Sequence, residues 1–173
     1  MIPDYNRYYG CVFTQLVENR SSITLQKLDV GIQGFYLIAG SIPLYIKYSR
    51  RRKGPWSFNF HADHQICCDE LCKKFGGCLI AFVCGSDGVL ALDNIQMREV
   101  LDDKFGEQEA ISVRRKLGHM YSVSGKDGKL DRKVARDSLA LLVEKYISAQ
   151  EPRSANSLSA SSPTLKFEET REV

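Results

Sequence analysis

The sequence predicts an α/β domain with a mixed central sheet flanked by helices. Segments in which apolar and polar residues alternate, as in half-buried strands, are interspersed with segments whose apolar residues recur at helical spacing. Such an order is typical of one layered α/β unit. At 173 residues, 43% hydrophobic and 26% charged, the chain is long enough for one domain with a full core. We therefore expect a single domain over residues 1–150.

The first half of the chain predicts two helices with strands between them. Apolar residues at helical spacing, Tyr8, Val12 and Leu16, predict a first helix that ends near Asn19. Strands are then expected over residues 22–28, 34–39, 43–49 and 56–60. The second and third of these form a hairpin around the Gly40-Ser41 turn, and Trp56, Phe58 and Phe60 share one face of the fourth. A second helix is predicted over residues 62–75, where Gly76 and Gly77 stop it.

The second half predicts two pairs of strands, each followed by a helix. Residues 78–84 are nearly all apolar, which predicts a buried strand, and residues 89–92 predict its neighbour after the turn at 86–88. Asp93 and Gln96 have the spacing of a capping box, which predicts a short helix to about Phe105. Strands over 110–115 and 119–124 and a last helix over 131–148 complete the domain.

A basic window without acidic residues separates Asp29 from Asp63. It contains five cations and an indole, namely Lys47, Arg50, Arg51, Arg52, Lys53 and Trp56. Cations without a nearby carboxylate favour binding to phosphate, and the indole predicts stacking on an unpaired base. A second basic run, Arg114, Arg115 and Lys116, follows the strand at 111–113. We expect the two runs to form one nucleic-acid-binding surface. A protein-interaction module with an acidic partner is the alternative, because charge runs also occur as plain solvated faces.

The order helix, hairpin, basic turn, strand, helix and strand over residues 8–92 resembles the restriction-endonuclease-like superfamily, PD-(D/E)XK, and especially its archaeal Holliday junction resolvase branch. The resemblance implies a restriction-endonuclease-like core. It places the family's acidic residues and lysine at Glu18, Asp29 and the triplet Tyr45-Ile46-Lys47, with Gln65 on the following helix. Some relatives act in phage defence, recombination or other DNA processing.

The same comparison argues against hydrolysis. Residues 45 and 47 share a strand face, and active relatives have a metal-binding carboxylate at the position of Tyr45. A tyrosine hydroxyl titrates near pH 10 and is a poor ligand for Mg²⁺. We therefore expect a binding protein with a degenerate nuclease-like fold, with no cofactor and no metal. The alternative is an active Mg²⁺-dependent nuclease that uses Glu18, Asp29 and Lys47.

The cysteines and histidines between His61 and Cys84 raise the question of a zinc site. His64, Cys68 and Cys72 fall at four-residue steps on one helix face, and the span from 64 to 72 is about 12 Å, too long for three ligands of one ion. Cysteine is also among the most buried residue types. We expect core packing and free thiols.

The ends of the chain bear on location. Residues 151–173 are rich in serine and poor in apolar residues, which predicts a disordered tail. The first ten residues contain no apolar stretch like that of a signal peptide, and no apolar run is long enough to cross a bilayer. We expect a cytoplasmic protein with no membrane partner.

Overall fold

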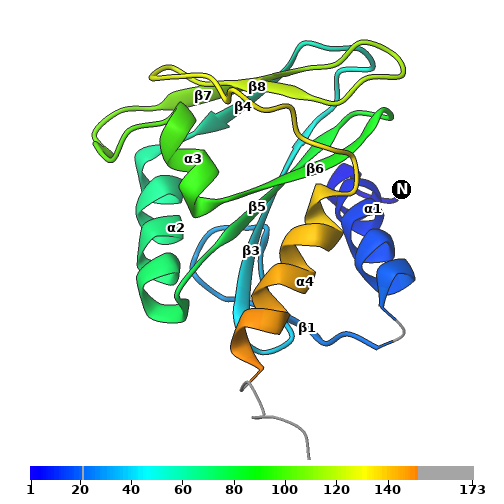
Figure 1. Ribbon diagram of the computed structural model, residues 1–173, viewed down its shortest axis with the longest axis vertical. Helices are drawn as coiled ribbons and strands as arrows, with labels where there is room; N and C mark the ends of the chain where they lie inside the picture. The colour runs from blue at the N-terminus through cyan, green and yellow to red at the C-terminus, as the bar shows by residue number, and fades with distance from the viewer. Residues whose placement is uncertain (21, 152–173) are drawn as a thin grey trace, which may run out of the picture.

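The computed structural model describes residues 1–20 and 22–151 and confirms an α/β fold with a mixed sheet flanked by helices (Figure 1). The predicted disordered tail lies outside the described residues, apart from Glu151. The helices are α1 (Asp4–Asn19), α2 (Ala62–Phe75), α3 (Asn94–Val100) and α4 (Ser138–Gln150). The strands are β1 (Leu25–Lys27), β2 (Phe35–Ile38), β3 (Ile42–Ser49), β4 (Trp56–Phe60), β5 (Leu79–Cys84), β6 (Gly88–Asp93), β7 (Glu109–Arg114) and β8 (Ser122–Ser124).

The larger sheet, sheet A, contains five strands in the order β1-β2-β3-β5-β6. The predicted hairpin of β2 and β3 is present, and Phe35 lies opposite Tyr45 in it. Strand β3 pairs in parallel with β5, and β5 pairs antiparallel with β6, so the sheet is mixed. All six residues of β5 are buried, which explains why its sequence is a continuous apolar run rather than an alternating one.

Alternation along β3 separates two hydrophobic layers. Leu44 and Ile46 pack in the layer that α1 and α4 cover, whereas Tyr45 faces the layer formed with α2, α3 and a second sheet. Because neighbouring strand residues point to opposite faces, Lys47 lies on the Tyr45 side. The fold therefore has three layers, and the face of sheet A opposite α1 holds the side chains discussed below.

The second sheet, sheet B, is antiparallel and has the order β4-β7-β8. The predicted strand at 56–60 thus leaves sheet A and pairs with β7, in the register that sets Trp56 opposite Val113. Its larger apolar residues pack inward, and its outer face is polar except for Ala110: Ser57, Asn59, Ala110, Ser112, Arg114, Ser122 and Ser124. In Figure 1 sheet B forms the top of the molecule, with the helices below it.

Two predicted helices have different bounds. Helix α3 ends at Val100 rather than near Phe105, because Leu101 is already extended. Helix α4 begins at Ser138 rather than at residue 131. The preceding segment is extended because Val134 and Tyr121 exchange two backbone hydrogen bonds of 2.8 and 2.9 Å, and this pairing places the segment beside sheet B. Strand β1 is also shorter than the predicted 22–28.

In the part of the chain that the structure covers, no helix combines the length and the apolar character needed to cross a bilayer.

The only tryptophan lies in the core between the two sheets. Trp56 is 2% exposed, and its ring packs edge-on against Tyr121 with 6.2 Å between centroids. Its indole Nε1 donates a 2.9 Å hydrogen bond to the carbonyl oxygen of Arg51. Trp56 therefore fixes the start of β4 and the basic turn that precedes it.

We expect Trp56→Ala to lower the free energy of unfolding by about 3–5 kcal/mol, because it removes a large buried ring. Trp56→Phe keeps most of the packing but leaves the Arg51 carbonyl without its donor, a loss of about 1–3 kcal/mol. Denaturant unfolding followed by far-ultraviolet circular dichroism measures both. Leu117→Ala is the control, because Leu117 is 92% exposed. A Trp56→Ala variant as stable as this control would contradict the core position.

Candidate nucleic-acid interface

The loops that carry the two basic runs lie at the same end of sheet B because β4 pairs with β7. The first run ends at β4, whose first residue Trp56 lies opposite Val113, the residue before the end of β7. In an antiparallel pair, the start of one strand adjoins the end of its neighbour. The loop of residues 50–55 and the loop of residues 115–121 therefore leave sheet B at the same end.

A groove of about 870 Å³ runs between these loops. Its lining contains Gly54 and Pro55 from the first loop and several cations from β7 and the segments around β8. Among the described residues, no Asp or Glu lines it. We call it the basic groove, and it is lined by Gly54, Pro55, Arg114, Arg115, Lys116, His119, Met120, Ser122, Val123, Ser124, Lys129 and Lys133.

The first basic loop is held in place by its own backbone. Besides the bond from Trp56, the Arg51 guanidinium Nη1 donates a 2.8 Å hydrogen bond to the Pro55 carbonyl oxygen. Arg50 forms a 3.0 Å ion pair with Asp4, but 72% of the Arg50 side chain is exposed, so this pair is weak. Arg52 and Lys53 are exposed. The exposed cations Arg52 and Lys53 therefore lie on a loop that hydrogen bonds hold in place.

Arg115 differs from Arg114 and Lys116 because it is ion-paired within the protein. The prediction made it a nucleic-acid ligand, but its side chain is 7% exposed and turns toward Asp87. Its Nε donates a 2.7 Å hydrogen bond to Asp87 Oδ2, and Nη2 donates to the other oxygen. These guanidinium hydrogen bonds lower the pKa of Asp87 below its usual range. Arg115 is therefore a structural residue whose charge is already neutralised, because β7 places it beside the β5–β6 turn.

Trp56 also needs correction as a binding residue. We expected it to stack on an unpaired base, but its ring lies in the core. The alternation that puts Phe58 and Phe60 inward puts Trp56 inward as well. Within residues 1–20 and 22–151, no tryptophan, tyrosine or phenylalanine lines the basic groove.

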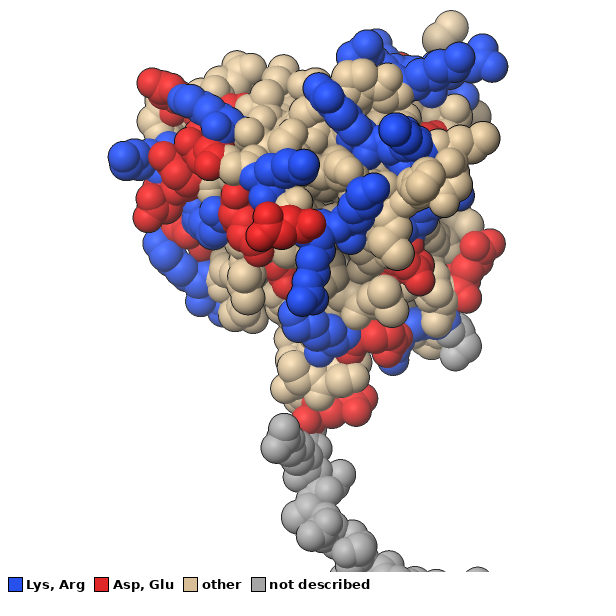
Figure 2. Space-filling model, turned by 45° about the horizontal axis from the view of Figure 1, so that its top comes forward, with Lys and Arg blue, Asp and Glu red and all other residues tan. Residues whose placement is uncertain are grey.

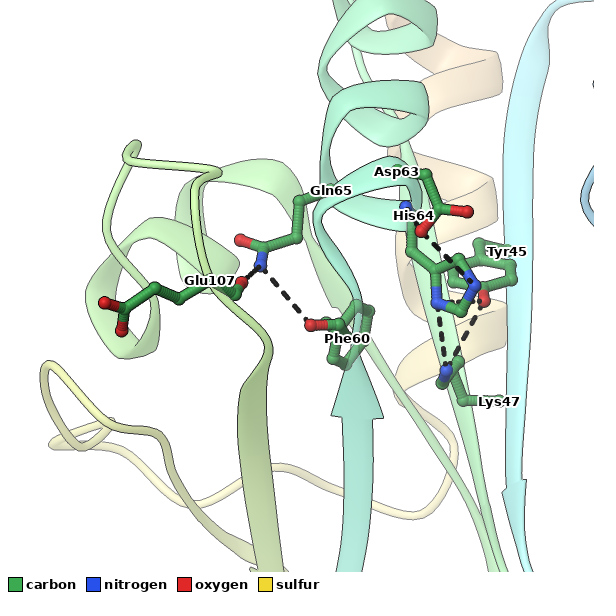
Figure 3. A network of polar contacts seen from close by, with 7 residues as sticks. All are labelled: Tyr45, Lys47, Phe60, Asp63, His64, Gln65 and Glu107. Carbon is green, nitrogen blue, oxygen red and sulfur yellow. Dashed lines mark hydrogen bonds and ion pairs between the residues drawn. The ribbon is translucent and has the colours of Figure 1, made fainter.

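Lys47 lies in a cluster of rings rather than in a metal site (Figure 3). Its Nζ is 3.4 Å from the Tyr45 hydroxyl and 3.4 Å from His64 Nδ1, and Tyr45 and His64 are themselves 3.1 Å apart. The ammonium also lies 5.0 Å from the centroid of the Phe60 ring. This cation–π contact partly replaces lost hydration.

The electrostatics of this cluster follow from burial. Desolvation lowers the pKa of Lys47 to about 8, although Cys68 and Asp63 raise it. Burial and Lys47 together lower the pKa of His64, so its imidazole is neutral at pH 7. Neutral His64 accepts at Nδ1, which leaves its proton on Nε2, 3.9 Å from Asp63 Oδ1. Burial raises the pKa of Tyr45, so it is an un-ionised phenol.

The other residues that the resemblance assigned do not join Lys47. Glu18 is exposed on the last turn of α1, and α1 covers the opposite face of sheet A. Asp29 is exposed in the loop after β1. The carboxylate that acts on Lys47 is Asp63, at the start of α2.

Gln65 is a structural residue. Its amide Nε2 donates to the carbonyl oxygens of Glu107, at 3.3 Å, and of Phe60, at 3.5 Å. Figure 3 shows it pointing away from Lys47, toward the loop that precedes β7. It ties α2 to sheet B.

The six cysteines are free thiols, and the five between residues 67 and 84 are buried or half-buried, as expected for core packing, whereas Cys11 is exposed. Cys67, Cys78 and Cys84 are buried, and Cys68 and Cys72 are half-buried. A hydrogen bond with Cys78, together with burial, raises the pKa of Cys68, and burial raises that of Cys67 to about 11. Thiols that stay protonated at neutral pH are poor nucleophiles. His64, which the sequence places on one helix face with Cys68 and Cys72, forms its side-chain contacts with Tyr45 and Lys47.

The prediction missed Lys129 and Lys133, which line the basic groove. They precede Val134, whose pairing with Tyr121 brings their segment beside sheet B. The sequence signal was available as the basic stretch between Gly128 and Arg136, but we had assigned part of that stretch to a helix. Figure 2, which turns the top of the molecule forward, shows Lys and Arg side chains spread over this face with Asp and Glu side chains among them.

Comparisons with family models, curated proteins and solved structures found no match to this chain. The resemblance to restriction-endonuclease-like nucleases therefore stays a hypothesis.

The lowered pKa of Lys47 predicts a pH-dependent stability. Between about pH 8 and pH 10.5 the unfolded chain binds more protons than the folded one, so the Lys47 contribution to stability increases with pH in this window. At pH 7 both states are protonated and the folded state bears the cost of the buried charge. We expect Lys47→Met to raise the free energy of unfolding by about 1–3 kcal/mol at pH 7.

That gain is expected to shrink as the pH is raised from 8 to 10.5, measured by urea unfolding at each pH. Lys53→Met is the matched control, because Lys53 is exposed and its substitution removes the same charge. A gain that is constant across this pH range would show that Lys47 is not desolvated in the folded protein.

Proposed function

We propose that this protein binds the phosphate backbone of nucleic acid in the basic groove. The observation that carries this proposal is a groove in which cations distant in sequence, from the end of β7 and from residues 129–133, gather without a carboxylate among the described lining residues. Arg114, Lys116, Lys129 and Lys133 supply the charge, and Arg52 and Lys53 extend it along the first loop. A groove lined by charge of one sign concentrates and orients a polyanion.

The outer face of sheet B supports recognition of the backbone rather than of the bases. Beside Arg114 it presents small polar side chains, mainly the serines Ser57, Ser112, Ser122 and Ser124. Hydroxyl groups donate hydrogen bonds to phosphate oxygens without reading sequence. Base stacking needs an exposed aromatic platform, and the groove lining has none. We therefore infer weak dependence on sequence and strong dependence on salt.

The nuclease alternative is less well supported by the same geometry. The position of a metal-binding carboxylate is occupied by Tyr45, which is 2% exposed and hydrogen-bonded to His64. Glu18 lies on the helix that covers the other face of the sheet. His64 lies between Asp63 and Lys47, with its Nε2 3.9 Å from Asp63 Oδ1, so Asp63 does not contact Lys47 directly (Figure 3). We infer a binding protein without nuclease activity.

We expect the double variant Arg114→Ala/Lys116→Ala to weaken binding to DNA or RNA at low salt. If each cation contacts one phosphate, the slope of log affinity against log salt becomes shallower by about 2. Fluorescence anisotropy with labelled single-stranded DNA, duplex DNA and RNA of mixed sequence measures both quantities and identifies the preferred strand.

The double variant Lys73→Ala/Lys74→Ala is the matched control. It removes the same charge from the exposed end of α2, and these residues do not line the basic groove. Its salt slope is expected to match that of the unmodified protein. Equal losses in the two double variants, or binding to an acidic polypeptide that resists salt, would overturn the proposal.

We expect no Mg²⁺-dependent cleavage of plasmid or single-stranded DNA by the unmodified protein. The site around Lys47 lacks the carboxylate that would hold the ion and orient its water. Gel analysis at millimolar Mg²⁺ or Mn²⁺ tests this, with Lys47→Ala and Asp29→Ala as matched variants. Cleavage that both substitutions abolish would establish the nuclease alternative.

A further inference from the structure

Three carboxylates from separate segments converge at the other end of β7. Asp102 follows α3, Glu109 is the first residue of β7, and Asp127 lies in the turn of residues 125–128 after β8. One oxygen of each lies within 4.8 Å of the others. From the sequence we expected no metal.

Glu109 is the member of this cluster that requires an explanation. It is 4% exposed, because the alternation of β7 turns it inward with Ile111 and Val113. Its Oε2 is buried and has no hydrogen-bond partner. Burial, followed by the charges of Asp127 and Asp102, raises its pKa. A buried carboxylate oxygen without a partner is costly, so the arrangement points to a missing positive ligand.

The two other carboxylates are held in position by backbone groups. The Asp102 amide donates a 3.0 Å hydrogen bond to Asp127 Oδ2, and the Lys104 amide donates a 2.8 Å hydrogen bond to Asp102 Oδ1. The turn that carries Asp127 packs its backbone against the end of α3. A Cβ at Gly125 would overlap the Val100 carbonyl oxygen, and one at Gly128 that of Glu99. The cluster is therefore built on rigid backbone.

The cluster has no ion-paired protein cation within the described residues, although Lys104 and Lys126 line the same hollow and the charge of Lys126 lowers the pKa of Glu109. Among residues 1–20 and 22–151, no Lys or Arg forms an ion pair with Asp102, Glu109 or Asp127. The nearby Lys126 instead pairs at 2.8 Å with the exposed Glu107. Residues of this cluster line a hollow of about 260 Å³, which gives water access to an ion.

We propose that Asp102, Glu109 and Asp127 form a binding site for one hard divalent cation of the Ca²⁺ class. Carboxylate oxygens are the preferred ligands of such ions, and Ca²⁺–O distances of about 2.3–2.6 Å allow two ligands to lie nearly 5 Å apart. Water fills the remaining coordination positions from the hollow. The ion links the end of α3, the start of β7 and the turn after β8.

This site has no part in the proposed binding chemistry. Glu109 begins β7 and Arg114 ends it, so the two are about 17 Å apart along the strand. The ion would stabilise sheet B from the end opposite the basic groove, whether or not that groove binds nucleic acid.

The test uses the full chain, treated with EDTA and dialysed, and titrated with CaCl₂, MnCl₂ and MgCl₂ by calorimetry and by thermal unfolding. We expect one ion per chain for at least one of these salts, with a dissociation constant of about 10⁻⁴–10⁻³ M, and a melting temperature that rises as the salt is added. No saturable binding and no rise up to ~10 mM of any of the three would overturn the proposal. Glu109 would then be a protonated acid that shares its hydrogen bond with Asp127.

Glu109→Gln keeps the size of the side chain and removes its charge, and we expect it to abolish the rise in melting temperature. Asp103→Asn is the control, since Asp103 is an exposed carboxylate in the same loop that does not belong to the cluster. If Glu109→Gln fails to fold, Asp127→Asn replaces it, because an asparagine oxygen can still accept from the Asp102 amide. If the melting temperature of either variant rises with added salt as much as that of Asp103→Asn, the proposed site is also overturned.

Discussion

The antiparallel pairing of β4 with β7 is the constraint on which the features of sheet B depend. It brings the loop of residues 50–55 beside the loop of residues 115–121, although about sixty residues separate them in the sequence. The same pairing turns Trp56 into the core opposite Val113. Because side chains alternate along β7, it also directs Arg114 outward and Glu109 inward. The basic groove and the carboxylate cluster therefore lie at opposite ends of β7.

Local patterns predicted the elements and the chemistry of each face well. The two-residue alternation in 56–60 identified a half-buried strand, and the continuous apolar run in 78–84 identified a fully buried one. The capping box at Asp93 and Gln96 is present as predicted. These signals are reliable because they arise within a few residues. The groove contains the second basic run, Arg114 to Lys116, but from the first loop only Gly54 and Pro55 line it.

Most of the misassigned site residues depend on long-range partners, and Trp56 is the exception. Arg115 belongs to a basic run in the sequence, but Asp87, 28 residues earlier, is the group that neutralises it. Trp56 appeared exposed only because its neighbours are charged, whereas its place in the strand alternation puts it in the core. Lys129 and Lys133 joined the groove through the pairing of Val134 with Tyr121. The carboxylates of Asp102, Glu109 and Asp127 come from three segments whose meeting no local pattern encodes.

A register argument shows why both sites require the same pairing. A slip of β7 by one residue would turn each of its side chains to the other face of sheet B. Arg114 would then point into the core, where a guanidinium has no partner, and Ile111 and Val113 would face solvent. Glu109 would move outward, which relieves its burial but breaks the carboxylate cluster. Burial of Ile111 and Val113 favours the observed register. The same register buries Glu109, which is a local cost in stability. A divalent cation at Asp102, Glu109 and Asp127 would offset this cost at the position where it arises.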